Sequence, residues 1–195
     1  MKLVAITGSI GCGKTTISDI LRSLGYLVYD IDKWVRYLYY RADFLAVIRK
    51  KFPEVFVGNV FDKKKLRELV FDNPAKLREL EALIHPFLTQ KLRRIIRKRV
   101  NKGIVFIDVA LLFELKWDKF CYSVVLADTD YETQKQRVMR RDNISADDFD
   151  KINKQQMPRE VKKMKADIII DTGVGKNKLR RNVVELVKVL EDGEY

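Results

Sequence analysis

Residues 3–16 read LVAITGSIGCGKTT, and this stretch decides the fold of the chain. Its first four residues are apolar and indicate a buried strand, and the turn that follows is rich in glycine. Residues 15–24 then have helical spacing. The motif G-x-x-x-x-G-K-[ST] is matched in this strand–loop–helix context by Gly8, Gly13, Lys14 and Thr15. The sequence therefore predicts a phosphate-binding loop.

A loop of this kind binds phosphate mainly with its backbone. Glycines let N–H groups close around phosphate oxygens, and the N-terminus of the next helix adds a partial positive charge. Lys14 can reach the β- and γ-phosphates, and the Thr15 hydroxyl can ligate Mg²⁺. An accidental glycine turn is the alternative, which the context disfavours. The predicted nucleotide contacts are Gly8, Gly11, Cys12, Gly13, Lys14, Thr15 and Thr16, with Cys12 as a small filler of the loop rather than a reactive thiol.

The composition limits the class of protein. A chain of 195 residues, 47% of them hydrophobic, can form one domain or one α/β core with a small insertion. Two cysteines do not make a disulfide framework, and no apolar segment approaches the length of a membrane span. The short apolar run at the N-terminus is needed for the first strand and does not suit a signal peptide. We therefore expect a cytoplasmic protein without a membrane partner.

The net charge of +12 leaves nucleic acid, an anionic membrane or a small polyanionic substrate open as partners. The densest basic run is residues 91–100. The apolar residues in and before it form one helical stripe, namely Leu88, Leu92, Ile95, Ile96 and Val100. The cations therefore lie on the opposite face of the helix. Because no nucleic-acid-binding motif accompanies them, the pattern favours a solvated helix face over a nucleic-acid patch.

Downstream of the loop, strands alternate with helices. The expected strands are residues 26–29, 104–108, 122–127 and 166–170, and the expected helices are residues 131–141, 145–156, 176–190 and a short one from Pro158. This alternation predicts an α/β fold, a parallel sheet flanked by helices. Residues 33–101 are instead mostly helical, with one helix that starts at Pro74 and breaks at His85-Pro86. They indicate a helical insertion.

Acidic residues follow two of the predicted strands. Asp30 and Asp32 come after the second strand, and Asp108 ends a continuous apolar run. Strand ends at the carboxyl edge of a parallel sheet face the ligand crevice, so a carboxylate there can accept the proton of a substrate hydroxyl. Asp108 can also support Mg²⁺ through water. A helix N-cap for the first pair and a turn acid for Asp108 are the alternatives.

Arginines form a third candidate group. Arg137 and Arg141 are four residues apart and share a helix face, with Arg140 beside them and Arg159 further on. Over a triphosphate they would neutralise charge in the transition state, and a mobile helical flap that carries them would exclude water. Solvated arginines are the alternative. His85, the only histidine, suits a packing position before a proline better than a catalytic one.

Several motifs occur in the order and spacing of one known family. The family opening T-G-G-I-G-S-G-K-S/T-T is similar to residues 7–16, and D-x-D-x-x-x-R matches residues 30–36. In the middle of the chain, L-x-x-L-E-x-x-x-H-P matches residues 77–86 and D-x-P-L-L-F-E matches 108–114. Further on, the matches are E-T-Q at 132–134, R-D at 141–142, Q-x-x-R-E at 156–160 and A-D-x-x-I-D at 166–171. In these segments, up to about residue 175, the sequence resembles the dephospho-coenzyme A kinases.

The resemblance implies that ATP phosphorylates the ribose 3′-hydroxyl of dephospho-coenzyme A, with Mg²⁺, in the last step of coenzyme A synthesis. It implies a core of residues 1–32, 103–136 and 166–195, a helical acceptor region of about 33–102 and a lid of about 137–165. The catalytic residues would be Asp32, Lys14, Arg137 and Arg141. Arg140 would bind the nucleotide, and the acceptor would be bound by Asp32, Arg36, His85 and Asp108.

Four residues depart from the family pattern, namely Ser9, Lys63, Ala110 and Thr172. Thr172 replaces an asparagine, which leaves the adenine contacts open. Two rival functions remain, another P-loop small-molecule or nucleoside monophosphate kinase and a basic nucleic-acid-binding P-loop ATPase. A GTPase would need a guanine-reading N-K-x-D, which the sequence lacks. We expect a monomer that binds dephospho-coenzyme A and no nucleic acid, with an oligomer left open.

Overall fold

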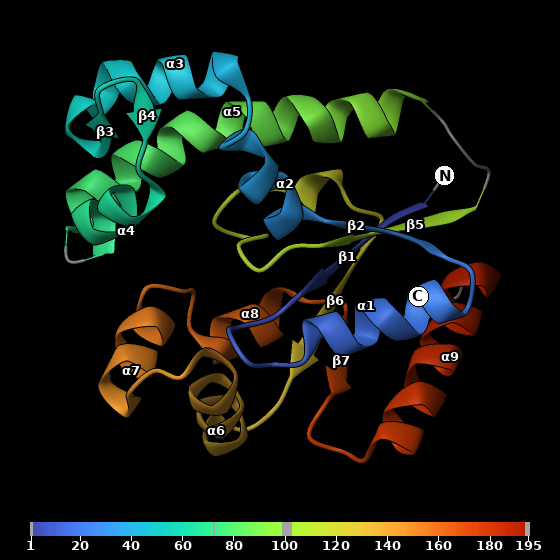
Figure 1. Cartoon of the computed structure of the whole chain (residues 1–195). Coiled ribbons are helices and arrows are strands. Elements are labelled where there is room, and N and C mark those ends of the chain that lie inside the picture. The colour runs from blue at the N-terminus through green and yellow to red at the C-terminus, as the bar shows by residue number, and fades with distance from the viewer. Residues whose placement is uncertain (1, 72, 99–102, 194–195) are drawn as a thin grey trace. The chain divides into compact units, whose positions relative to one another are not determined.

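The computed structural model describes residues 2–71, 73–98 and 103–193. The chain divides into two compact units, Met1–Asp30 with Arg99–Tyr195, and Ile31–Lys98. The first contains a parallel sheet with its helices, and the second is mostly helical (Figure 1).

The first unit is built on five parallel strands in the order β2-β5-β1-β6-β7. Their bounds are β1 Lys2–Thr7, β2 Leu27–Asp30, β5 Ile104–Asp108, β6 Ser123–Asp128 and β7 Ile168–Asp171. β5 and β6 are buried along their whole length, as expected of strands that are covered on both faces. The predicted parallel sheet is confirmed, and each predicted strand lies within two residues of its expected bounds.

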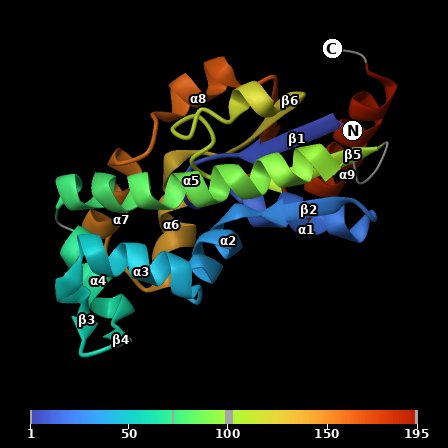
Figure 2. The ribbon, with the colours of Figure 1, turned by 90° about the horizontal axis from the view of Figure 1, so that it is seen from above.

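The helices of this unit are α1 Lys14–Ser23, α6 Tyr131–Asp142, α7 Ala146–Lys154, α8 Arg159–Lys165 and α9 Lys176–Asp192, with a 3₁₀ turn η2 at Asp118–Phe120. α1 and α9 share one core cluster with the sheet, in which Ile17 and Val183 pack with Val4 and Ile6 of β1. α8 packs against β6 (Figure 2). The phosphate loop follows the central strand, β1, and so lies at the carboxyl edge of the sheet, where ligands bind in such folds.

The second unit packs three helices against one long helix. Its elements are α2 Ile31–Leu38, α3 Ala42–Lys51, η1 Pro53–Val55, β3 Phe56–Val57, β4 Val60–Phe61, α4 Lys63–Phe71 and α5 Pro74–Lys98. β3 and β4 form a small antiparallel hairpin. Asp62 caps α4, since its Oδ1 accepts hydrogen bonds from the backbone N–H groups of Lys64 and Lys65.

The predicted break at His85-Pro86 is wrong, because α5 continues through Pro86. A proline inside a helix removes one backbone hydrogen bond and crowds the preceding turn. Burial on one side offsets this cost, since every fourth residue along this part of α5 is buried, namely Leu80, Ile84, Leu88 and Leu92. The hydrophobic stripe therefore runs unbroken past the proline.

The basic run lies on this same helix. Arg93, Arg94 and Arg97 are exposed, while Leu92 is fully buried, so the predicted division into an apolar and a charged face is confirmed for residues 91–97. Arg99 and Val100, the end of the run, lie outside the described residues. Across the described part of the chain, no helix combines the length and the apolar character that a membrane span requires.

Candidate active site

The phosphate loop takes a path that only glycine allows at two positions. A Cβ on Gly8 would lie 2.5 Å from the carbonyl oxygen of Ala127 on β6. Gly11 has a φ of 78°, and a Cβ there would lie 2.7 Å from the carbonyl oxygen of Gln134 on α6. The loop is therefore pressed against both β6 and α6, which holds its backbone N–H groups in place.

The functional side chains of the loop lie at the start of α1. Lys14 Nζ donates hydrogen bonds to the carbonyl oxygens of Gly8 at 2.7 Å and Ser9 at 3.2 Å, so its ammonium lies over the loop. Thr15 and Thr16 are exposed in the first turn. Cys12 is 2% exposed, and burial raises the pKa of its thiol, which stays protonated at neutral pH. This supports its interpretation as a filler.

Asp108 is buried at the end of β5, between β1 and β2. Its Oδ2 accepts a hydrogen bond of 2.7 Å from the Ser18 hydroxyl of α1. Ser18 lies one turn after Thr15, so the carboxylate is held beside the helix whose first turn carries the expected metal ligand. The sequence analysis missed Ser18. The sequence indicates this role of Ser18 only through its position, three residues after Thr15 and on the buried face of the helix.

Asp128, at the end of β6, was also missed. Arg159 donates two hydrogen bonds of 2.7 Å to its carboxylate, and Lys163 Nζ lies 3.4 Å from Oδ2. This bidentate pair fastens α8 to the edge of the sheet. Arg159 was grouped with the arginines expected over a triphosphate. In the structure it pairs with Asp128, and its expected contact with a triphosphate stays a prediction. Asp128 ends an apolar run in the same way as Asp108, and that signal could have found it.

Thr172 connects the loop after β7 to the phosphate loop. Its hydroxyl lies 2.7 Å from the carbonyl oxygen of Cys12 and 3.1 Å from that of Asp128. Arg137 Nη2 donates a hydrogen bond of 2.9 Å to the Thr172 carbonyl. Beside these groups lies a pocket of about 260 Å³, lined by Gly13, Thr16, Arg137, Thr172, Val174, Lys176 and Leu179. Thr172, one of the four residues that depart from the family pattern, thus lies at the border of a pocket next to the loop.

Replacing Thr172 by valine should lower the free energy of unfolding by about 1–3 kcal/mol, because the buried Cys12 carbonyl loses its donor. Thr172→Ser keeps the hydroxyl and should recover most of the loss. Chemical denaturation of the three proteins measures the difference. Equal stability of the valine variant and the unmodified protein would show that the hydrogen bond contributes nothing to stability.

Of the three arginines of α6 that were predicted to act at the loop, only Arg137 has a hydrogen bond that links it to the loop in the described part of the structure. Arg137 reaches it through Thr172. Arg141 donates two hydrogen bonds to the neighbouring Asp142, at 2.8 and 2.7 Å, and both it and Arg140 are exposed. The predicted roles of Arg140 in nucleotide binding and of Arg141 in catalysis therefore stay predictions.

Three of the four acceptor residues that the resemblance implies lie in the helical unit, and the fourth, Asp108, lies in the sheet unit. Asp32 is in the first turn of α2 and Arg36 is four residues later, so the two exposed side chains share a helix face. His85 is half-buried on α5. Burial lowers the pKa of its imidazole, an effect that Glu81, one turn earlier, partly opposes. His85 is therefore neutral at pH 7.

The lowered pKa of His85 makes stability depend on pH. The unfolded chain protonates this histidine from about pH 6.5 downward, before the folded chain does, so stability should fall as the pH drops below that value. His85→Gln should remove this contribution. Denaturation midpoints of both proteins between pH 8 and pH 5 test it. Parallel curves would show that the folded and unfolded histidines titrate alike.

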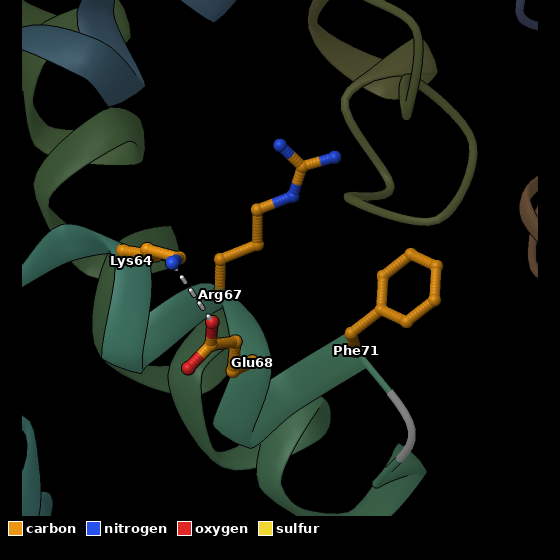
Figure 3. A pocket seen from close by; sticks show the side chains of 4 residues that line it. All are labelled: Lys64, Arg67, Glu68 and Phe71. Atoms are coloured by element: carbon orange, nitrogen blue, oxygen red, sulfur yellow. Dashed lines mark ion pairs between the residues drawn. The ribbon is translucent and has the colours of Figure 1, made fainter. Parts of the chain in front are cut away.

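The helical unit also has a pocket of about 400 Å³, which the sequence did not suggest. It is lined by Lys64, Arg67, Glu68 and Phe71 of α4 (Figure 3). Lys64 and Glu68 form an ion pair of 3.8 Å, and Figure 3 shows Arg67 and Phe71 extending from the helix on its open side. All four of these residues lie on α4.

Comparison with known proteins agrees with this geometry. A family model described as dephospho-CoA kinase matches residues 2–177. The chain belongs to the dephospho-CoA kinase family. A dephospho-CoA kinase of Bartonella henselae is 38% identical over 192 residues, which cover 97% of this chain and 98% of the relative.

Solved structures place the fold in the same family. A crystal structure of a Thermus thermophilus protein is 30% identical with a TM-score of 0.84, and covers 96% of both chains. A dephospho-CoA kinase from Campylobacter jejuni is 26% identical with a TM-score of 0.73, and covers 99% of this chain and 98% of its own. The fold is that of a P-loop kinase, and membership of the dephospho-CoA kinase family makes the protein an ATP-using enzyme.

Proposed function

We propose that the protein transfers the terminal phosphate of ATP to the ribose 3′-hydroxyl of dephospho-coenzyme A. The observation that supports this most is the glycine loop with Lys14 over it, in a chain that matches dephospho-CoA kinases over nearly its whole length. Phosphoryl transfer requires that the acceptor is held in line with the transferred phosphate, that the charge of the phosphate is neutralised and that water is excluded. It requires little covalent chemistry from the protein.

The nucleotide half of the proposal rests on the sheet unit. The triphosphate would lie on the loop N–H groups and Lys14, and the adenine would enter the 260 Å³ pocket beside Arg137 and Thr172. The donor set suits Mg²⁺, because Thr15 offers an exposed hydroxyl and Asp108 a carboxylate held by Ser18. When bound, Mg²⁺ would neutralise charge on the transferring phosphate.

The acceptor half rests on the helical unit. We propose that Asp32 orients the acceptor hydroxyl and accepts its proton, since a carboxylate is already a base at neutral pH. Arg36, on the same face of α2, is a cation suited to the diphosphate of the acceptor. A neutral His85 can donate or accept a hydrogen bond without adding charge.

An acceptor panel tests the proposal. Release of ADP from ATP and Mg²⁺ is measured with dephospho-coenzyme A, AMP, shikimate, single-stranded DNA or water. We expect fast release only with dephospho-coenzyme A. Fast release with AMP or shikimate would favour another small-molecule kinase, and stimulation by DNA would favour a nucleic-acid-dependent ATPase.

A further inference from the structure

Lys162 of α8 is a buried cation to which the proposed phosphoryl transfer assigns no role. It is 1% exposed, and its ammonium donates no hydrogen bond to any described residue. The carboxylate oxygen Oε1 of Glu114 lies 4.0 Å away, too far for a hydrogen bond. That same oxygen accepts a hydrogen bond of 2.9 Å from the backbone N–H of Met157.

An ammonium in this position is costly to the fold. Removal from water disfavours the charged form, and the loss is recovered only where the donors find acceptors. Burial accordingly lowers the pKa of Lys162, while Glu114 raises it and Lys14 lowers it further. Methionine or leucine would fill the same space without this cost. Stability alone therefore gives no reason for a lysine here.

The surroundings of Lys162 belong to the phosphate loop. Its pKa is affected by the charges of both Lys14 and Cys12, so Lys162 interacts electrostatically with the loop. The turn before α8 is joined to the loop directly, since the backbone N–H of Ile10 donates a hydrogen bond of 2.9 Å to Gln156 Oε1. Together with the Arg159–Asp128 pair, this contact holds α8 beside the loop.

We propose that Lys162 is a second phosphate-binding ammonium of the loop, and that it binds the terminal phosphate of ATP. This rests on the proposed function, and it assigns a role that neither the sequence motifs nor the lid arginines cover. Phosphate oxygens would supply the acceptors that the ammonium lacks, and its charge would add to that of Lys14 on the transferring group. The Glu114 carboxylate, 4.0 Å away, favours the charged form of the ammonium and so opposes the effect of burial on its pKa.

The test compares Lys162→Met with Lys165→Met. Lys165 is an exposed lysine on the same helix, over the ring of Phe113, so its variant controls for the loss of one charge. Affinities for ATP and for ADP are measured without dephospho-coenzyme A, together with the melting temperature. We expect Lys162→Met to weaken ATP binding about ten- to a hundredfold and ADP binding less than about threefold. Its melting temperature should be unchanged or higher, and the Lys165 variant should match the unmodified protein.

Other outcomes overturn the proposal. Equal weakening of ATP and ADP would place the contact away from the terminal phosphate. Unchanged ATP affinity with a lower melting temperature would make Lys162 the structural partner of Glu114. Failure of both Lys162→Met and Lys162→Gln to fold would contradict it as well, because the ammonium makes no hydrogen bond within the described part of the chain whose loss would cost stability. If the unmodified protein binds no ATP, the proposed function itself fails.

Discussion

Replacing Lys14 by alanine should lower kcat by about a hundredfold to a thousandfold. Its ammonium lies over the loop, within hydrogen-bond distance of the Gly8 and Ser9 carbonyl oxygens, where a P-loop lysine binds the β- and γ-phosphates. Loss of one such group from a preorganised site typically costs two to three orders of magnitude. Steady-state release of ADP with dephospho-coenzyme A measures the effect.

A matched control separates this effect from a change in net charge. Arg93→Ala removes an exposed cation from the helical unit and should leave kcat within about twofold, as expected for a solvated side chain. A Lys14→Ala variant that keeps a near-normal rate and a normal melting temperature would show that the loop lysine does not act on the transferred phosphate.

Asp32→Asn should reduce kcat by more than about a hundredfold while ATP still binds normally, because the amide keeps the size of the side chain and loses its basicity. Asp32 lies in the first turn of α2 and is exposed, so the substitution should change the melting temperature little. Titration of ATP in the absence of the acceptor gives the affinity, and single-turnover kinetics give the rate of transfer.

Asp30→Asn is the comparison variant. Asp30 ends β2 two residues earlier, beside Asp108 in the sheet, and should have the smaller effect on kcat. An equal loss of rate from both variants would assign the role to the strand end as a whole. A loss of ATP affinity in Asp32→Asn would make this carboxylate part of the nucleotide site or of the fold.

Much of the sheet unit could be predicted because its signals are local. A buried parallel strand is a continuous apolar run, and the glycine motif marks the strand–loop–helix unit that starts the fold. Ser145 likewise caps α7 from a neighbouring position, since its hydroxyl accepts a hydrogen bond from the backbone N–H of Asp148. In each case the residues that decide the structure are neighbours in the chain.

What could not be predicted depends on partners far apart in the chain. α5 continues through Pro86 because of burial against other helices, which no local proline rule contains. The bond from Ser18 to Asp108 spans 90 residues, and that from Thr172 to Cys12 spans 160. Nothing in the local sequence distinguishes Lys162 from the other lysines of its helix, and only the fold shows that it is buried. Sequence patterns identify the types of residue at the site, and the fold decides which of them meet.

The central claim is that the amide-lined loop passes the terminal phosphate of ATP to one alcohol of the acceptor. Transfer from ATP labelled in its γ-phosphate, followed by mass spectrometry of the products, tests it most directly. The account predicts that the label appears on the ribose 3′-oxygen of dephospho-coenzyme A, with one ADP formed for each product. Label found only in inorganic phosphate, or on any other acceptor position, would contradict it.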